Sequence, residues 1–237
     1  MWDKIKRLVE QGNTRAYLAW DLAFLKSGVA LVLMPGAQVC WTKTLIAQPR
    51  RPKKVTDWVI QQRLKSLSEQ TSEWELENLV PYLSGVFAET PEQFQFVLAK
   101  SGRGSSHAAI VSAGMVKAWL IISLWQLGWE KEIVFVDPKR IDGGLAVPVP
   151  VTHDLIARQQ GDIVADIMTK SMSKTKMRRR FCLAAVTHDR GWYSVKDGKL
   201  VRSEDEGDAA AIGIVGAQTT EFGDIDSLRV SWRRKKK

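Results

Sequence analysis

The chain has 237 residues, of which 45% are apolar and 26% charged, and its formal net charge is +9. This length suits one large domain or a domain with a small lobe, and the apolar content can fill a sizeable core without disulfides or metal. The cysteines, Cys40 and Cys182, are far apart and show no CxxC spacing. A disulfide scaffold and a cysteine-based zinc site are therefore excluded, and no signal peptide is visible. We expect an intracellular protein, whether cytoplasmic or nuclear.

Most of the positive charge lies in three short segments. Residues 50–54, 170–180 and 233–237 contain 4, 6 and 5 Lys or Arg residues and no acid, so the rest of the chain carries 20 − 26 = −6. Concentrated charge of this kind is typical of a protein with a phosphate-rich partner, although a basic run can also be a solvated linker or tail. The predicted nucleic-acid contacts are Arg50, Arg51, Lys53, Lys54, Arg103, Lys174, Lys176, Arg178, Arg179 and Arg180.

The N-terminal region, residues 1–48, is predicted to hold two helices and a hairpin. Residues 2–11 form an amphipathic pattern, and Thr14 could cap a second helix that runs to Lys26 and is apolar nearly all round. Short apolar runs at 29–34 and 37–42 flank a Pro-Gly turn, which predicts a β-hairpin. Residues 49–55, with two prolines among four cations, are predicted to be an exposed basic linker.

Residues 56–170 are predicted to form a helical core. Thr56 precedes one helix, capping boxes at 72–75 and 90–93 predict two more, and Ser106 begins a long apolar helix that ends at Gly128. The run 108–129 is about as long as a bilayer-spanning helix, but Lys117 near its middle favours a core helix. A short strand at 133–136 and a last helix capped by Thr152 complete this region.

The C-terminal region changes to alternating and turn-rich patterns. A basic joint at 171–180 leads to a β-rich region at 181–232 and a basic tail at 233–237. The predicted strands are 181–187, 192–195, 209–215 and 227–232, and Asp197-Gly198 predicts a tight type I′ hairpin. The expected fold class is therefore α+β, with a helix-rich N-terminal two-thirds and a small antiparallel sheet at the C-terminal end.

No catalytic signature stands out. The loop 101–106 could bind an anion at a helix N-terminus, but it matches no phosphate-binding motif. The three histidines lack metal-ligand spacing, and the acids Asp137, Asp142, Asp154, Asp162 and Asp166 are interpreted as a solvated face. We therefore expect no catalytic residue, no metal and no cofactor. Trp41, Trp192 and Trp232 are candidates for stacking on bases.

Three functional hypotheses follow. The first is a non-catalytic nucleic-acid-binding protein, for example one that coats or packages single-stranded RNA or DNA. The alternative is an assembly or matrix-like protein that contacts an anionic membrane surface or a ribonucleoprotein, with protein partners or self-assembly. The third is a nucleic-acid-processing enzyme, which requires the scattered acids and histidines to converge in space. The sequence does not choose between DNA and RNA.

Overall fold

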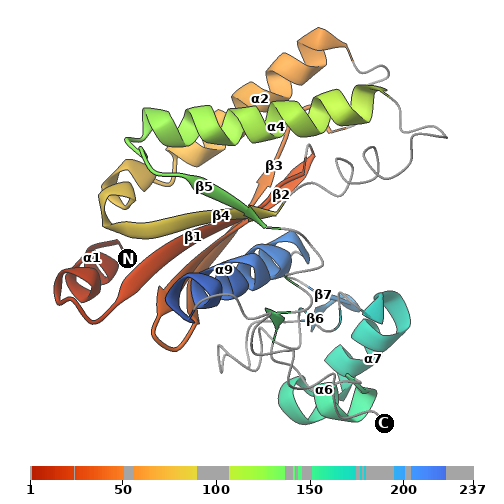
Figure 1. The fold of residues 1–237 in the computed structure, drawn as a ribbon. Helices are drawn as coiled ribbons and strands as arrows, with labels where there is room; N and C mark the ends of the chain where they lie inside the picture. Colours follow the sequence, from red (N-terminus) through yellow and green to blue (C-terminus); the bar gives the residue numbers. More distant parts are fainter. Residues whose placement is uncertain are drawn as a thin grey trace, which may run out of the picture.

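A computed structural model describes residues 2–23, 25–50, 56–89, 107–136, 141, 144–145, 151–174, 177, 179, 195–200 and 204–222. At its centre is a five-stranded mixed sheet with the order β3-β2-β1-β4-β5 (Figure 1). Its strands are β1 (Arg15–Asp21), β2 (Lys26–Met34), β3 (Gln38–Ile46), β4 (Leu83–Glu89) and β5 (Ile133–Val136). The first three strands form an antiparallel meander, whereas β4 runs parallel to both β1 and β5.

Helices cover both faces of this sheet. On one face lie α1 (Trp2–Glu10), α2 (Asp57–Ser72) and α4 (His107–Gln126), and on the other lies α9 (Glu204–Phe222) (Figure 1). The short helices α6 (His153–Gln160) and α7 (Asp162–Ser171) lie beyond α9. Two 3-10 turns, η1 (Leu76–Asn78) and η2 (Val80–Tyr82), lead into β4, and β6 (Val195–Lys196) pairs with β7 (Lys199–Leu200) as a separate hairpin.

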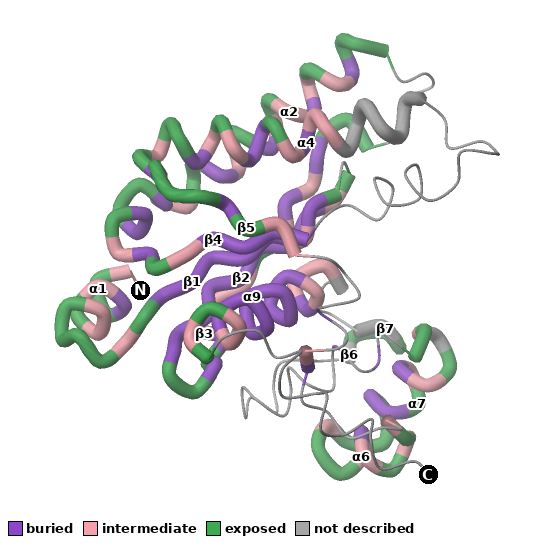
Figure 2. The backbone as a smooth tube through the Cα atoms, viewed as in Figure 1, coloured by how far each residue is buried: buried purple, intermediate pink, exposed green. Residues whose placement is uncertain are grey.

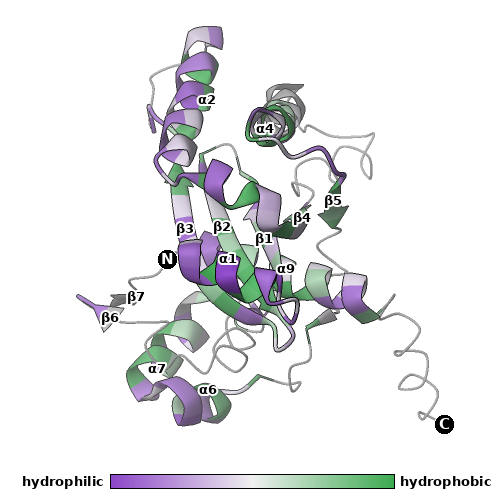
Figure 3. Ribbon diagram, turned by 90° about the vertical axis from the view of Figure 1, so that its left-hand side faces the viewer, coloured by the Kyte–Doolittle hydropathy of each residue, from purple (hydrophilic) through white to green (hydrophobic). Residues whose placement is uncertain are grey.

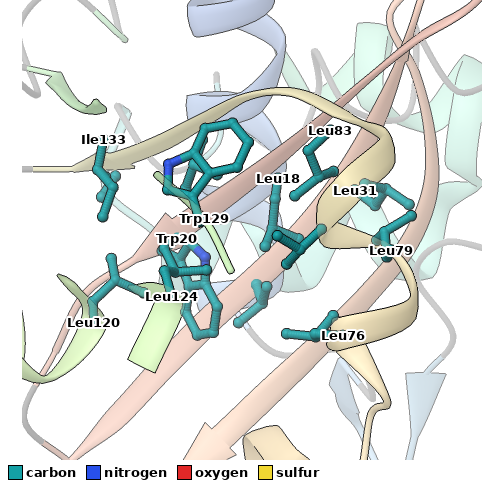
Figure 4. Close-up of a cluster of buried hydrophobic side chains, with 14 of the residues drawn as sticks. Leu18, Trp20, Leu31, Leu76, Leu79, Leu83, Leu120, Leu124, Trp129 and Ile133 are labelled. Carbon is teal, nitrogen blue, oxygen red and sulfur yellow. The ribbon is translucent and has the colours of Figure 1, made fainter. Parts of the chain in front are cut away.

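The sheet separates two hydrophobic cores because side chains alternate between its faces. Leu18 and Trp20 of β1 point toward α2 and α4, where they join Leu120 and Leu124 (Figure 4). Tyr17 and Ala19 point the other way, toward α9. Figure 2 shows that the central strands and the middle of α9 are buried. Figure 3 shows hydrophilic residues along much of α2 and a hydrophobic α4 beside it.

Small residues let α9 lie unusually close to the sheet. A Cβ atom added to Gly213 would come within 2.6 Å of Val32 Cγ2, and one added to Gly216 would come within 2.5 Å of the Phe87 ring. The neighbouring Ala209 and Ala210 are fully buried. The α9 backbone therefore packs directly on β1, β2 and β4, which places the first turn of the helix over the end of the sheet.

The predicted layout is wrong, because the sheet lies in the N-terminal part of the chain and the long C-terminal element is a helix. The helix expected from Thr14 to Lys26 is instead β1 and the start of β2. A central strand buried on both faces is a continuous apolar run, and such a run lacks the alternation that distinguishes a strand from a buried helix.

Two further local predictions are wrong. The strand predicted at 209–215 is the middle of α9, where alanine and glycine provide close packing and not a strand pattern. No α-helix follows the predicted capping box at 72–75, because α2 continues to Ser72 and a left-handed Glu75 (φ 53°) leads into the 3-10 turn η1.

Several local predictions are confirmed. They include α1, the hairpin of β2 and β3, α4, β5 and α2, whose Thr56 hydroxyl accepts a hydrogen bond from the Val59 backbone N–H. Asp197 (φ 52°) and Gly198 (φ 70°) form the predicted tight turn of the β6–β7 hairpin. Thr152 caps α6, but Gly161 (φ 91°) separates α6 from α7, where one helix was expected. The predictions for 90–93, 181–187 and 227–232, and for most of 192–195, lie outside the described residues.

The apolar run at 108–129 belongs to a core helix. Trp119, Leu120 and Leu124 of α4 are buried against the sheet, and Lys117 Nζ lies 3.8 Å from the centroid of the Phe135 ring. In the described part of the chain, no helix is long and apolar enough to cross a membrane.

Candidate active site

Two acidic residues end neighbouring parallel strands at the same edge of the sheet. Asp21 is the last residue of β1 and Glu89 the last of β4, and the register pairs Trp20 with Ala88 just before them. Because the two strands run in parallel, their carboxyl ends coincide. Asp21 follows Tyr17 and Ala19 in the alternation of β1, and Glu89 follows Phe87 in β4, so both acids lie on the face covered by α9.

The N-terminal end of α9 adds two more acids to this place. Asp205 and Asp208 are three residues apart, so they share one face of the helix. Carboxylates are also favoured in a first helical turn, where the backbone N–H groups carry partial positive charge. Asp208 shares Arg179 with Glu89, and the Asp205 backbone lies against Gly28, the partner of Asp21 in the sheet. Both acids therefore lie beside the ends of β1 and β4.

The start of α9 is fixed to the sheet by several contacts. Lys26 of β2 forms an ion pair with Asp205. The hydroxyls of Thr42 and Thr44 donate hydrogen bonds to the two Glu206 carboxylate oxygens, at 2.6 and 2.8 Å. Gly28, which pairs with Asp21 across the sheet, allows the closest approach, because a Cβ there would lie 1.7 Å from the Asp205 carbonyl oxygen.

Electrostatics at the site disfavour the ionised form of Asp21. Burial raises the pKa of Asp21 well above its usual range. The negative charges of Asp208, Glu89 and Asp205 raise it further, and the positive charge of Arg179 opposes them. Asp21 therefore lies among several negative charges, and a positively charged group nearby favours its ionised form.

Arg179 supplies such a positively charged group. Its Nη2 lies 3.3 Å from Glu89 Oε1, and its Nη1 lies 3.3 Å from Glu89 Oε2 and 3.5 Å from Asp208 Oδ1. Both side chains of the Arg179–Glu89 pair are nearly inaccessible, at 8% and 7% exposure. The arginine thus bridges the end of β4 and the N-terminal end of α9.

The donor set can be compared with what a divalent metal ion requires. Carboxylates that share a site are the usual protein ligands of Mg²⁺ in phosphodiester chemistry. Among the described residues, however, no group of three carboxylate, imidazole or thiol side chains is arranged to hold a metal ion. The site has suitable donors, but in this arrangement they do not fit a metal, and Arg179 and Lys26 bind the carboxylates instead.

The predicted nucleic-acid contacts have different environments. Arg50 and Lys174 are exposed, whereas Arg179 is buried in the carboxylate cluster. The other predicted contacts lie outside the described residues: Arg51, Lys53, Lys54, Arg103, Lys176, Arg178 and Arg180. Trp41, a predicted stacking residue, is partly buried and packs edge-on against Trp2 and Trp74 at the border of the core. Trp192 and Trp232, the other two, lie outside the described residues.

The acids singled out from the sequence are not those of the cluster. Asp162 and Asp166 are exposed, as expected, and Asp166 Oδ1 lies 2.9 Å from His153 Nε2. The acids of the cluster were missed because each looked unremarkable in its own segment. Two features of the sequence could have indicated the cluster. Two apolar runs each end in an acid, and an Asp-x-x-Asp precedes the small residues of α9.

No protein-family model matches this sequence, and no curated protein sequence matches it significantly. The fold is similar to that of RuvC from Thermus thermophilus. The RuvC structure has a TM-score of 0.52 and 14% identity, with 88% of this chain and 97% of that chain covered. The structure of T. thermophilus RuvC in complex with a Holliday junction substrate has a TM-score of 0.50 and 12% identity, covering 89% and 97%. The fold is therefore RuvC-like.

This likeness corrects the leading functional hypothesis. The expectation of a non-catalytic nucleic-acid-binding protein is wrong, because nearly the whole chain shares its fold with a protein solved with its substrate, and four acids converge at one edge of the sheet. A membrane surface or a protein partner has no support in the fold or in the comparisons.

Proposed function

We propose that this protein is a nucleic-acid-processing enzyme that cleaves phosphodiester bonds in DNA, with Asp21, Glu89, Asp205 and Asp208 as its catalytic centre. The observation that carries the proposal is the convergence of these four carboxylates at the ends of two parallel strands and the start of α9. In an open α/β sheet, a site outside the carboxyl ends of the strands is the usual place for a ligand.

The fold likeness supports DNA as the partner. The RuvC structure with a Holliday junction substrate covers 89% of this chain, so a branched DNA is the first substrate to test. The basic segments of the sequence suit the same partner, because a phosphate backbone attracts clustered Lys and Arg residues. The carboxylates come from three different elements, so the centre exists only in the folded chain.

A cleavage assay tests the proposal. The purified chain is incubated with end-labelled four-way junction, linear duplex and single-stranded DNA, in Mg²⁺, Mn²⁺ or EDTA. We expect cleavage of the junction, and at least a hundredfold loss of rate in Asp21→Asn, Glu89→Gln and Asp208→Asn. Such losses are typical when a group that acts on the transition state is removed.

A matched control is Glu69→Gln on α2, because Glu69 is exposed and its only described ion pair is with Lys65 on the same helix. This variant should cleave at the wild-type rate. Wild-type protein that cleaves none of the three DNAs under any cation, or an Asp21→Asn variant with full activity, would contradict the proposed function. Cleavage of duplex and junction at equal rates would support a nuclease without branch preference.

A further inference from the structure

The hairpin turn that follows Asp21 presents an apolar side chain beside the carboxylate cluster. Leu25 is 47% exposed, and Ala23 in the same turn is exposed as well. The fully buried Ser27 fixes this turn, because its hydroxyl accepts a hydrogen bond of 3.1 Å from the Ala23 backbone N–H and donates one of 2.8 Å to the Ala23 carbonyl oxygen. The turn therefore holds Leu25 at the carboxyl edge of the sheet.

The start of the basic linker lies next to this turn. The Ala47 backbone N–H donates a hydrogen bond of 3.0 Å to the Leu25 carbonyl oxygen, one residue after the end of β3. Arg50 follows three residues later and is exposed. Three residues span at most about 10 Å. An exposed leucine and an exposed arginine thus belong to one continuous stretch of the edge.

Helix α2 supports this stretch with two polar side chains. The Gln70 amide accepts a hydrogen bond of 3.1 Å from the Ile46 backbone N–H and donates one of 3.0 Å to the Ile46 carbonyl oxygen. Arg63, which is 4% exposed, donates hydrogen bonds to the carbonyl oxygens of Pro49 and Arg50, at 3.1 and 3.4 Å. Residues seven apart lie on the same face of a helix, so one face of α2 holds both the end of β3 and the start of the linker.

A DNA strand at the carboxylate cluster would also reach this stretch. Leu25 follows Asp21 by four residues, so the two lie at most about 14 Å apart. One DNA strand advances about 3.4 Å per nucleotide, and this distance corresponds to about four nucleotides. Leucine side chains can pack against bases, and arginines bind phosphates. Because residues 50–54 hold four cations and no acid, the charge of the linker is complementary to DNA.

We propose that the β1–β2 turn and the start of the basic linker form a docking surface for the DNA next to the cleaved bond. In this surface, Leu25 packs against sugars or base faces, and Arg50 binds a backbone phosphate. The inference rests on the proposed function, because it takes the carboxylate cluster as the place where DNA is cleaved. It deepens that function by naming the residues that hold the substrate beside the cluster.

Binding measurements test the inference without using cleavage. In an Asp21→Asn background, chosen to prevent cleavage, fluorescence anisotropy follows the binding of a labelled four-way junction across a salt series. Leu25→Ala should weaken binding by roughly three- to tenfold, because about half of the residue is left to bury, and should not change the slope of log affinity against log salt. Arg50→Gln should weaken binding and also flatten that slope by about 0.7 to 0.9.

Two matched controls make the same kinds of change elsewhere. Ile163→Ala on α7 shortens an apolar side chain that is 67% exposed, and Lys65→Gln on α2 removes an exposed cation. Both should match the Asp21→Asn parent in affinity and slope. All four variants should unfold within about 2 °C of the parent, because exposed substitutions change stability little. Should Leu25→Ala unfold earlier, Leu25→Gln replaces it, and the same loss of affinity is expected.

An unchanged affinity in the Leu25 variant, or an unchanged affinity and slope in Arg50→Gln, would overturn this inference. Losses no larger than those of the two controls would overturn it as well. The proposed function stands in these cases if the wild type cleaves DNA. Absence of junction binding in the parent also overturns the inference, and the cleavage assay on the wild type then decides the proposed function separately.

Discussion

The contacts and the pKa of a residue in this protein depend on its burial and its neighbours more than on its residue type. Arg179 and Lys174 belong to one basic segment, yet the first is buried in an ion-pair network and the second is exposed. Asp21 and Asp166 are both aspartates, but burial and like charges raise the pKa of Asp21, whereas the hydrogen bond from His153 lowers the pKa of Asp166. Only the first environment is suited to a reactive centre.

Cys40 gives a prediction at this scale. Burial raises the pKa of its thiol to about 12, so almost none of it is thiolate at neutral pH. In a Cys182→Ser variant, where Cys40 is the single thiol, we expect labelling by iodoacetamide at pH 7.5 to be at least tenfold slower than for the same protein in urea. Equal labelling rates for the folded and unfolded protein would show that the thiol is accessible and ionised. A Cys40→Ser, Cys182→Ser double variant gives the background rate.

At the scale of elements, the decisive feature is how closely α9 lies on the sheet. Its small residues face β1, β2 and β4, and its first turn is held by Lys26, Thr42 and Thr44. These contacts determine where the carboxylates of that turn lie. A shift of about 1 Å in such a turn is enough to lower a catalytic rate by about a hundredfold.

The substitution Gly28→Ala tests this arrangement. A Cβ at this position would lie 1.7 Å from the Asp205 carbonyl oxygen, which is backbone and cannot rotate away, so the start of α9 must move. We expect a loss of about 1–3 kcal/mol in the free energy of unfolding, as for other overpacked sites, and a larger proportional loss of cleavage. Urea unfolding and the cleavage assay measure the two effects.

Gly114→Ala in α4 is the control for this substitution, since nothing lies within 4 Å of a Cβ built there. Alanine should be neutral or stabilise the helix by up to about 1 kcal/mol. If Gly28→Ala were as harmless as Gly114→Ala in both measurements, the close contact between α9 and β2 would not position the carboxylates.

At the scale of the whole molecule, the clustered acids and the exposed cations lie in different parts of the fold. The acids converge at the carboxyl edge of the sheet, whereas the exposed cations Arg50 and Lys174 lie in segments outside the sheet. Arg63 of α2 is buried and donates hydrogen bonds to the carbonyl oxygens of Pro49 and Arg50, at 3.1 and 3.4 Å. It therefore holds the start of the basic linker against the helix and presents Arg50 to solvent.

We expect the exposed cations to contribute to DNA affinity through phosphates. Each neutralised phosphate adds about 0.7 to 0.9 to the slope of log affinity against log salt. In an Asp21→Asn background, which prevents cleavage, Arg50→Gln with Lys174→Gln should weaken binding to every sequence and flatten the slope by roughly 1.4 to 1.8. Fluorescence anisotropy across a salt series gives both quantities.

Lys65→Gln on α2 serves as the control for charge alone, because Lys65 is exposed but pairs with Glu69 on its own helix. It should leave the slope unchanged. The slope could also be the same in the Asp21→Asn background, the Arg50→Gln with Lys174→Gln variant and the Lys65→Gln variant. That result would mean that other parts of the chain contact the DNA.

The sequence alone determined the local elements whose signals lie within a few residues. The caps Thr56 and Thr152, the Asp197-Gly198 turn and the Pro35-Gly36 hairpin were predicted correctly because each depends on nearby backbone hydrogen bonds and dihedral angles. The basic segments also indicated a nucleic-acid partner, because clustered charge is visible in the sequence without knowledge of the fold.

Only the tertiary structure decided the sheet and the site. A strand buried on both faces and a helix buried all round are both continuous apolar runs, so β1 could not be distinguished from a helix, and α9 resembled a strand. The carboxylates Asp21, Glu89 and Asp208 come from three distant segments, and they meet because β1 and β4 are parallel neighbours and α9 crosses their ends. In the sequence, Arg179 could not be distinguished from a surface cation, because only folding brings its acidic partners close to it.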